Sequence, residues 1–328
     1  MSELISILIP VYNCREWVAQ AIESALQQSW SEKEVIVLDD GSTDGSMEAI
    51  AAYRGRVRIE SAPNGGQNTS RNRLTALSQG EWLVYLDADD ELAPDSVEQK
   101  MRFSGVADAI YGSYDFATFR GAERLDSHRV PAEDYPDPVV AAFKWKFPNT
   151  SSLLFRRSAV EIAGGWNEEI RNCTDYDLYF RLLARGHRFK AAPEAMSLYR
   201  QWSVAQAVNE SPFRRATTQL NVMRAAAQEL QRVGQMSPTR EQAFLDASLV
   251  VIRSIYQMDR ERAFQEHDWI KMNYPDYRPQ AGPLAAPYIY AYAALGFTGA
   301  EWLAAGMRLF RRPAKADWRK TGWEGLNS

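Results

Sequence analysis

The chain has 328 residues, of which 45% are apolar, and this is enough for a substantial hydrophobic core. It carries 38 basic and 42 acidic residues, a formal net charge of -4, so no overall positive field attracts nucleic acid. Composition therefore predicts a folded, soluble protein and excludes nucleic acid as a partner.

The N-terminus and the cysteine content favour the cytoplasm. Glu3 precedes a very short apolar run, which is unlike a secretory signal. The only two cysteines, Cys14 and Cys173, are expected to be free thiols in a reducing compartment. The longest uncharged stretch, 279–300, is interrupted by glycines and prolines, so no membrane span is predicted there.

The N-terminal third alternates short apolar strands with amphipathic helices, a pattern typical of a parallel sheet covered on both faces. Strands are predicted at 4–9, 34–38, 57–60 and 82–86, and helices at 15–28, 46–53 and 69–78. Acidic loops follow the second and fourth of these strands. Ligands of open α/β sheets bind beyond the carboxyl ends of strands, so both loops are candidate site segments.

The pattern changes after residue 107. Segment 107–155 contains aromatic, strand-like pieces between prolines, and we expect irregular structure that covers a pocket. A helix is predicted at 175–185, and helices continue from 211 to 272. The sequence thus predicts an α/β domain over residues 1–204 and an appended helical region over 205–328.

Three carboxylates, Asp87, Asp89 and Asp90, directly follow the strand predicted at 82–86. Carboxylates crowded at one strand end repel each other unless a cation or solvent neutralises them, and hard oxygen ligands suit Mg²⁺ or Mn²⁺. An acidic helix cap is the structural alternative, because Pro94 and Asp95 are suited to open a helix. The role of loop 39–44 is also undecided from its own residues, because these residue types are common in ordinary turns and N-caps.

Four segments taken together are more specific. They are 6–13 (SILIPVYN), 37–44 (VLDDGSTD), Arg71-Asn72 and 86–90 (LDADD). In this order and spacing they resemble the family 2 glycosyltransferases of the GT-A fold, over about residues 4–200. The resemblance implies a mixed, Rossmann-like sheet flanked by helices. It also implies inverting transfer of a sugar from a nucleoside diphosphate, most commonly UDP, to an acceptor hydroxyl.

The resemblance also implies roles for individual residues. The nucleoside and donor sugar are expected to contact Pro10, Val11, Tyr12, Asn13, Asp39 or Asp40, Arg71, Asp87 and Ala88. Asp89, together with Asp87, is expected to hold Mn²⁺ or Mg²⁺. These roles suit the chemistry, because a carboxylate accepts a hydrogen bond from a base N–H and an arginine offers a fixed fork of donors to phosphate. A surface arginine near a helix start is the alternative for Arg71.

Residues 164–169 (GGWNEE), followed by 173–178 (CTDYDL), resemble a second signature of the family. Asp175 aligns with the family's presumed base, which deprotonates the acceptor hydroxyl. Thr174 replaces the first acid of the family's pair, and Thr174 and Asp177 have the spacing of a capping box. For Asp175 the alternative is a charge that favours a helix N-terminus.

Two departures from the family pattern permit a competing hypothesis, a catalytically impaired protein that only binds nucleotide sugars. Thr174 replaces an acid, and Trp202 stands close after Tyr199-Arg200, where family members often carry a histidine. The intact Asp87, Asp89 and Asp175 favour the enzyme, which would build a glycan or glycolipid from a saccharide or lipid-linked acceptor.

Beyond about residue 205 the sequence resembles no known family. Trp302, Leu303, Met307 and Phe310 are predicted to give a late helix an apolar side, and basic residues cluster beside it: Arg308, Arg311, Arg312 and Lys315. Such a segment suits contact with an anionic membrane surface at the inner face of the membrane. Packing of these apolar residues in a core, with a solvated basic tail, is the alternative.

Overall fold

The computed structural model describes residues 3–201, 211–280 and 284–310, with side chains described as far as residue 306. The chain forms two compact units, residues 1–138 with 147–209, and residues 139–146 with 210–328. The domain boundary expected after residue 204 lies in segment 202–210, outside the described residues.

The first unit is built on a sheet with the strand order β3-β2-β1-β4-β8-β6-β9-β5. Its first half is parallel and comprises β1 (Ile5–Val11), β2 (Lys33–Asp39), β3 (Arg58–Ser61) and β4 (Trp82–Tyr85). The connections contain α1 (Val18–Leu26), α2 (Ser46–Ala51) and α3 (Gln67–Leu77). The strands and helices predicted for the N-terminal third are confirmed, with ends displaced by a few residues. All seven residues of β1 are buried, because a central parallel strand is covered on both faces.

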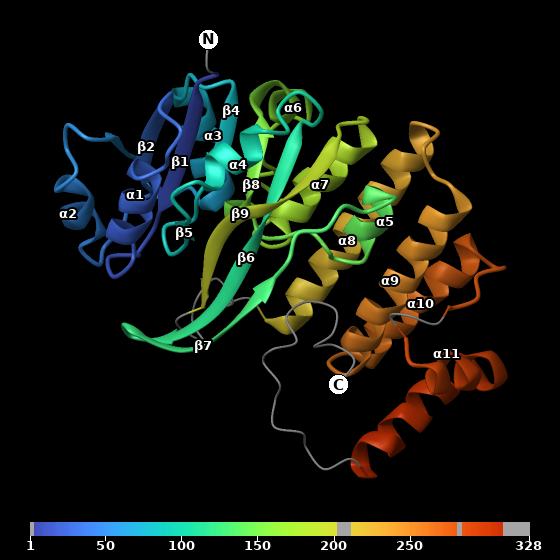
Figure 1. Ribbon diagram of the computed structural model, residues 1–328. Coiled ribbons are helices and arrows are strands. Elements are labelled where there is room, and N and C mark those ends of the chain that lie inside the picture. The colour runs from blue at the N-terminus through green and yellow to red at the C-terminus, as the bar shows by residue number, and fades with distance from the viewer. Residues whose placement is uncertain (1–2, 202–210, 281–283, 311–328) are drawn as a thin grey trace. The chain divides into compact units, whose positions relative to one another are not determined.

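The second half of the sheet is mixed. The strands are β5 (Glu91–Leu92), β6 (Ala109–Arg120), β7 (Glu123–Val130), β8 (Leu153–Arg156) and β9 (Phe189–Gln201). Strand β8 is antiparallel to β4 and β6, whereas β9 is parallel to β6. Four short elements complete this half: α4 (Ser96–Met101), the 3₁₀ turn η1 (Thr150–Ser152), α6 (Arg157–Ile162) and α7 (Thr174–Ala184). Figure 1 shows helices flanking the curled sheet, as the predicted fold class requires.

The expectation of irregular structure over 107–155 was wrong. Strands β6 and β7 form an antiparallel hairpin there, and η1 and β8 follow. Strand β7 has the sequence ERLDSHRV, in which apolar and polar side chains do not alternate, and none of its residues is fully buried. The periodicity that reveals a half-buried strand is therefore absent from this sequence.

The second unit is helical. It comprises most of α5 (Pro138–Phe143), with α8 (Pro212–Arg232), α9 (Pro238–Tyr256), α10 (Arg260–Asn273) and α11 (Ala286–Phe310). The side chains of Ser211, Ser237 and Asp259 cap the first three long helices by accepting a backbone N–H three residues later. Helix α11 is interrupted at Gly296, whose φ is 69°. In the described part of the chain, no helix combines the length and the apolar character of a membrane span.

Candidate functional site

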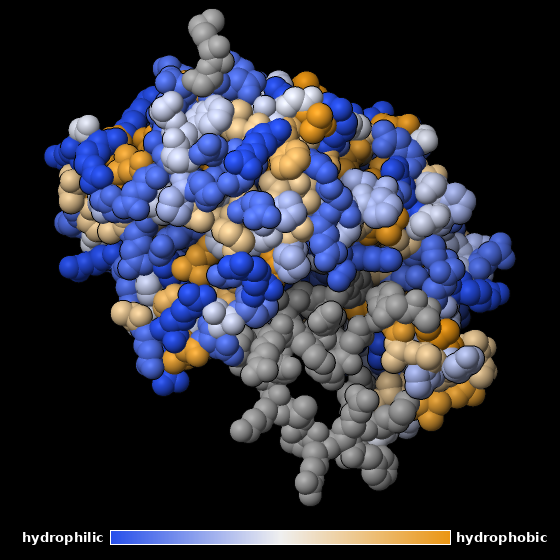
Figure 2. Space-filling view, in the orientation of Figure 1, coloured by the Kyte–Doolittle hydropathy of each residue, from blue (hydrophilic) through white to orange (hydrophobic). Residues whose placement is uncertain are grey.

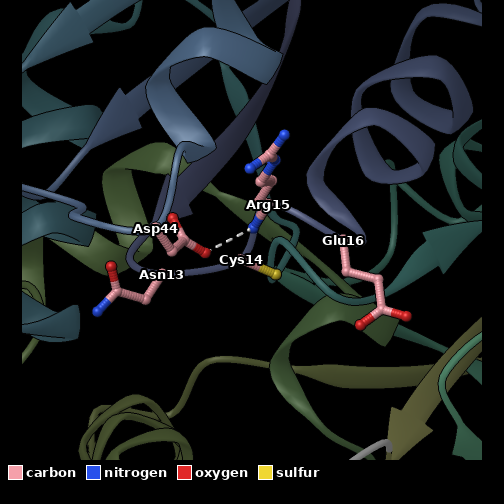
Figure 3. A pocket seen from close by; sticks show the side chains of 5 residues that line it. All are labelled: Asn13, Cys14, Arg15, Glu16 and Asp44. Atoms are coloured by element: carbon pink, nitrogen blue, oxygen red, sulfur yellow. Dashed lines mark hydrogen bonds between the residues drawn. The ribbon is translucent and has the colours of Figure 1, made fainter.

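Two loops meet where β1 and β2 end. The backbone N–H of Asn13 donates to Ser42 Oγ at 3.0 Å, and Thr43 N–H donates to Asn13 Oδ1 at 2.8 Å. Beside them Arg15 N–H donates to Asp44 Oδ2 at 3.0 Å (Figure 3). Asn13 adopts a φ of 50°, which asparagine tolerates better than most residues. The turn-forming side chains of loop 39–44 therefore hold the β1 loop in place.

A cavity of about 430 Å³ opens beside these loops. Its lining comprises Asn13, Cys14, Arg15, Glu16 and Asp44, which Figure 3 shows around the start of the β1 loop. Arg15, Glu16 and Asp44 give this lining charges of both signs.

Asp39 and Asp40 have different surroundings. Both oxygens of Asp40 are used, because Gly65 N–H and Gly66 N–H donate to Oδ1 and Oδ2, each at 2.9 Å. Asp39 is only 3% exposed, and its Oδ2 accepts from Ser42 N–H at 3.2 Å. Its Oδ1 is buried without a hydrogen-bond partner among the described residues. An unsatisfied buried carboxylate oxygen costs free energy, so Asp39 rather than Asp40 has an acceptor to offer to a ligand N–H.

The other residues expected at the nucleoside differ in exposure. Pro10 and Val11 are the buried last residues of β1, and Ala88 is buried in the acidic loop after β4. Tyr12 is 54% exposed. Among these four, the ring of Tyr12 therefore offers the largest accessible surface.

Arg71 is buried, not a surface arginine, so that alternative was wrong. It is 2% exposed and lies on α3, where its Nη2 donates to Asp87 Oδ1 at 2.7 Å. Its Nη1 is 3.4 Å from Thr174 Oγ1, and its guanidinium lies 4.3 Å from the centre of the Trp166 ring. Arg71 thus joins the acidic loop to the start of α7.

The three carboxylates of the acidic loop differ in burial and in hydrogen bonding. Asp90 is fully buried and accepts from Asn149 Nδ2 at 2.8 Å, Ser151 Oγ at 2.7 Å and Arg200 N–H at 3.0 Å. Burial, and then the charges of Asp89 and Asp87, raise the pKa of Asp90 well above its ordinary value. Asp87 and Asp89 are half-buried. A helix does begin at Ser96 with Asp95 as its N-cap, as the alternative expected. The acidic loop does not cap it, because β5 separates the two, so that part of the alternative was wrong.

The donor chemistry of this loop fits a hard divalent cation. Two half-buried carboxylates, Asp87 and Asp89, lie beside a buried third, and their mutual repulsion is the condition that a cation relieves. Among the described residues, no three histidine, cysteine or carboxylate side chains converge on one point as a complete site. The oxygens of a diphosphate are ligands that could complete the shell of an ion bound to these carboxylates.

Asp175 lies in the first turn of α7 and is half-buried. Burial is the largest influence on its carboxyl group and raises its pKa, while the positive charge of Arg71 opposes this rise. A raised pKa makes a carboxylate a better proton acceptor near neutral pH.

The capping box expected for Thr174 and Asp177 was wrong. The N-cap is Cys173, with a φ of 56° and no side-chain cap, and Thr174 is already helical. The carboxylate of Asp177 pairs with Arg181 at 2.6 Å instead.

Sequence reasoning missed the partners that hold these residues. Trp166 packs on Arg71, and Asn72 fixes it by accepting Trp166 N–H at 2.8 Å. Arg200, 3% exposed, pairs with Glu91 and packs 4.3 Å from the Trp17 ring. The Gly-Gly-Trp and Tyr-Arg patterns are visible in the sequence, but the sequence does not show which side chains Trp166 and Arg200 contact. Trp202, which stands where the family often has histidine, lies outside the described residues.

Known proteins resemble this chain in sequence and in fold. Residues 6–161 match the sequence profile described as glycosyl transferase family 2. The chondroitin synthase of Pasteurella multocida is 32% identical over 193 residues, which cover 57% of this chain and 19% of the relative. The chain thus spans about a fifth of that relative's length.

Two solved structures resemble the fold. Residues 1–349 of S. aureus TarS, in complex with UDP-GlcNAc, give a TM-score of 0.62 at 14% identity, over 95% of this chain and 93% of the other. The mannosyltransferase PcManGT from Pyrobaculum calidifontis, in complex with GDP-Man and Mn²⁺, gives 0.54 at 15% identity, over 98% and 88%. At these identities the likeness shows a shared fold alone.

Proposed function

We propose that this chain, which carries a domain of glycosyl transferase family 2, transfers a sugar from a nucleoside diphosphate to an acceptor hydroxyl with inversion. One observation carries the proposal. The buried Arg71 contacts both Asp87 in the acidic loop and Thr174, the neighbour of Asp175. A donor-binding loop and a candidate base are therefore held by one side chain, as a transfer between two substrates requires.

Recognition of the nucleotide is assigned to the ends of β1 and β2. Asp39 Oδ1, buried without a partner among the described residues, accepts the imide N–H of uracil. Tyr12 packs against the nucleoside, and Pro10, Val11 and Asn13 shape this edge of the site. A uridine donor suits a single acceptor oxygen, and the UDP-GlcNAc complex of TarS supports this choice. Guanine also presents N–H donors, so GDP is the principal competitor.

The diphosphate is assigned to Arg71 and the acidic loop. Asp89 and Asp87 would hold Mn²⁺ or Mg²⁺, with Ala88 between them near the donor sugar; PcManGT, which binds Mn²⁺, supports this assignment. When bound, the ion supplies positive charge that stabilises the leaving diphosphate. Arg71 adds a permanent charge from the buried side of the same loop.

Asp175 is assigned as the general base. Its carboxylate takes the proton from the acceptor hydroxyl while that oxygen attacks the anomeric carbon. The bond between the anomeric carbon and the diphosphate oxygen breaks on the opposite face, which inverts the configuration. The raised pKa of Asp175 suits this role.

A saccharide or lipid-linked acceptor is proposed, with peripheral membrane contact through α11. The core-packing alternative for its apolar residues does not hold for Trp302 and Leu303, which are 71% and 48% exposed. Figure 2 shows an orange and tan surface over α11. Met307, Phe310 and Arg308 have no described side chains, and Arg311, Arg312 and Lys315 lie outside the described residues.

Liposome flotation tests this contact. Binding to vesicles with anionic lipid, lost on Trp302→Ser together with Leu303→Ser, is expected. The absence of binding to anionic vesicles by the unmodified chain would refute it.

The proposed function itself is tested by calorimetric titration of UDP, GDP and dTDP in Mn²⁺ and in EDTA. We expect UDP to bind only with the metal, and UDP-sugars to be hydrolysed slowly without acceptor. Metal-dependent binding without turnover of any UDP-sugar would favour the non-catalytic binding protein. The absence of nucleotide binding would contradict both.

A further inference from the structure

An exposed aromatic ring stands at the end of β9, beside the candidate site but outside every role assigned above. Tyr199 is 37% exposed. Its ring packs edge-on against Phe116 at 5.5 Å and against Tyr114 at 6.2 Å between ring centres. Phe116 in turn contacts His128 at 5.3 Å. Two rings of β6, one of them packed against His128 of β7, therefore support Tyr199 without covering it.

The strand register places Tyr199 next to the acidic loop. Its neighbour Arg200 donates its backbone N–H to Asp90 Oδ1 at 3.0 Å, and its other neighbour, Leu198, pairs with Glu91. Because both neighbours in the chain are bonded to the acidic segment, the backbone of Tyr199 is fixed relative to it.

The direction of the ring follows from the alternation of side chains along a strand. Arg200 points toward Trp17, so Tyr199 points to the opposite face of the sheet. On that face Ser197 Oγ is 2.7 Å from Ser152 Oγ in η1. Helix α7, which carries Asp175, is anchored just before η1, because Tyr179 OH donates to Pro148 O at 3.1 Å. Tyr199 and the candidate base thus share one face.

Electrostatics agree with this placement. Desolvation raises the pKa of Tyr199, and the next contributions are the negative charges of Asp90 and Asp89, followed by those of Asp87 and Asp175. The negative charges of the acidic loop and of the candidate base therefore act on the Tyr199 ring. Structural packing alone explains the contact with Phe116, but it does not require a large ring that is more than a third exposed here.

A pyranose is the ligand that suits such a surface. One face of a pyranose is lined by C–H groups that pack on an aromatic ring, while its hydroxyls need polar partners at the ring edge. Tyr199 offers the aromatic surface, and the half-buried Asp175 offers a carboxylate on the same side of the sheet. The donor sugar is already assigned to Ala88, earlier in the acidic loop.

We propose that Tyr199, supported by Tyr114 and Phe116, is the platform on which the sugar ring of the acceptor lies while its hydroxyl faces Asp175. This inference rests on the proposed function. It assigns the acceptor class as a saccharide recognised by its ring face.

Saturation-transfer NMR tests the platform without requiring turnover. The full chain, with UDP and Mn²⁺, is mixed with p-nitrophenyl glycosides of glucose, galactose, mannose, GlcNAc and GalNAc and with a chondroitin tetrasaccharide. At least one saccharide is expected to show transfer to its ring C–H protons. Tyr199→Ala is expected to weaken this binding about tenfold, whereas Tyr199→Phe retains it. Tyr290→Ala, which removes an exposed tyrosine of α11, is the matched control.

The outcomes separate this inference from the proposed function. UDP affinity within twofold of the unmodified chain in Tyr199→Ala, with saccharide binding weakened, supports the platform. Saccharide binding within twofold of the unmodified chain in Tyr199→Ala overturns it, as does the absence of binding by every saccharide tested. Equal loss of UDP and saccharide binding also overturns it, because Tyr199 would then only maintain the fold. Failure of the unmodified chain to bind any nucleotide would instead contradict the proposed function.

Discussion

Lys100 offers a sharp test of the packing of the first unit. It lies in α4, is fully buried, and donates to Ser96 Oγ at 2.9 Å. Burial lowers its pKa from 10.5 to about 7. The folded pKa is below the unfolded one, so the unfolded chain binds more protons between these values and stability must rise with pH across that window. At 1.36 kcal/mol per pH unit, the cost of the buried amine at pH 7 is about 5 kcal/mol.

Replacement by methionine keeps the length of the side chain and removes the charge. We expect Lys100→Met to raise the free energy of unfolding at pH 7 by several kcal/mol. The upper limit is the full cost of burying the amine, about 5 kcal/mol. The advantage should shrink by about 1.4 kcal/mol for each pH unit between 7 and 10.5, because the wild-type amine is neutral in the folded chain but still protonated in the unfolded chain, and removing that proton costs less as the pH rises. Urea unfolding followed by circular dichroism between pH 7 and 10 measures this.

The exposed Lys144, replaced by methionine, is the control for a general effect of charge removal. An advantage of Lys100→Met that is independent of pH, or a loss of stability at pH 7, would show that the amine is not buried as described.

Three further predictions concern the site and the helical unit. Asp39→Asn should weaken UDP binding about ten- to a hundredfold in calorimetry, because it presents a donor or a weaker acceptor to the base N–H; unchanged affinity would exclude Asp39. Arg71→Met should leave Asp87 without its buried partner and lower the free energy of unfolding by about 3 kcal/mol in urea, and a loss below 1 kcal/mol would contradict the ion pair. Burial lowers the pKa of His267 from 6.5 to about 4, so the unfolded chain binds more protons in that window and stability should fall by up to about 3 kcal/mol between pH 6.5 and 4. In His267→Phe the loss of stability between pH 6.5 and 4 should be smaller by this amount. An unchanged dependence of the unfolding free energy on pH would refute the assignment to His267.

The parallel half of the sheet was predictable because its signal is local. Strand β1 is an apolar run interrupted only by Ser6, buried on both faces, and turn-forming residues mark its end. The hairpin of β6 and β7 was not predictable in the same way, since no residue of β7 is fully buried and packing on the neighbouring strand selects its conformation.

The candidate site shows the same limit. Sequence patterns pointed to Asp39 and Asp40 together, and only the donation of Gly65 and Gly66 N–H to Asp40 separates them. The burial of Arg71 depends on Trp166, which is distant in sequence. The capping box at Thr174 failed because Cys173 adopts a positive φ, which spacing does not reveal. Motifs thus indicate which side chains gather, while contacts between distant segments decide what each side chain does.

The central claim is that Asp175 removes a proton from the acceptor in a metal-dependent sugar transfer. The most direct measurement is release of UDP from UDP-sugars, with Mn²⁺, by the unmodified chain and by Asp175→Asn, alongside calorimetric UDP binding for both. The account predicts that the variant binds UDP within twofold of the unmodified chain and loses turnover by about 10²- to 10⁴-fold. Turnover by Asp175→Asn at the unmodified rate, with UDP binding intact, would contradict it.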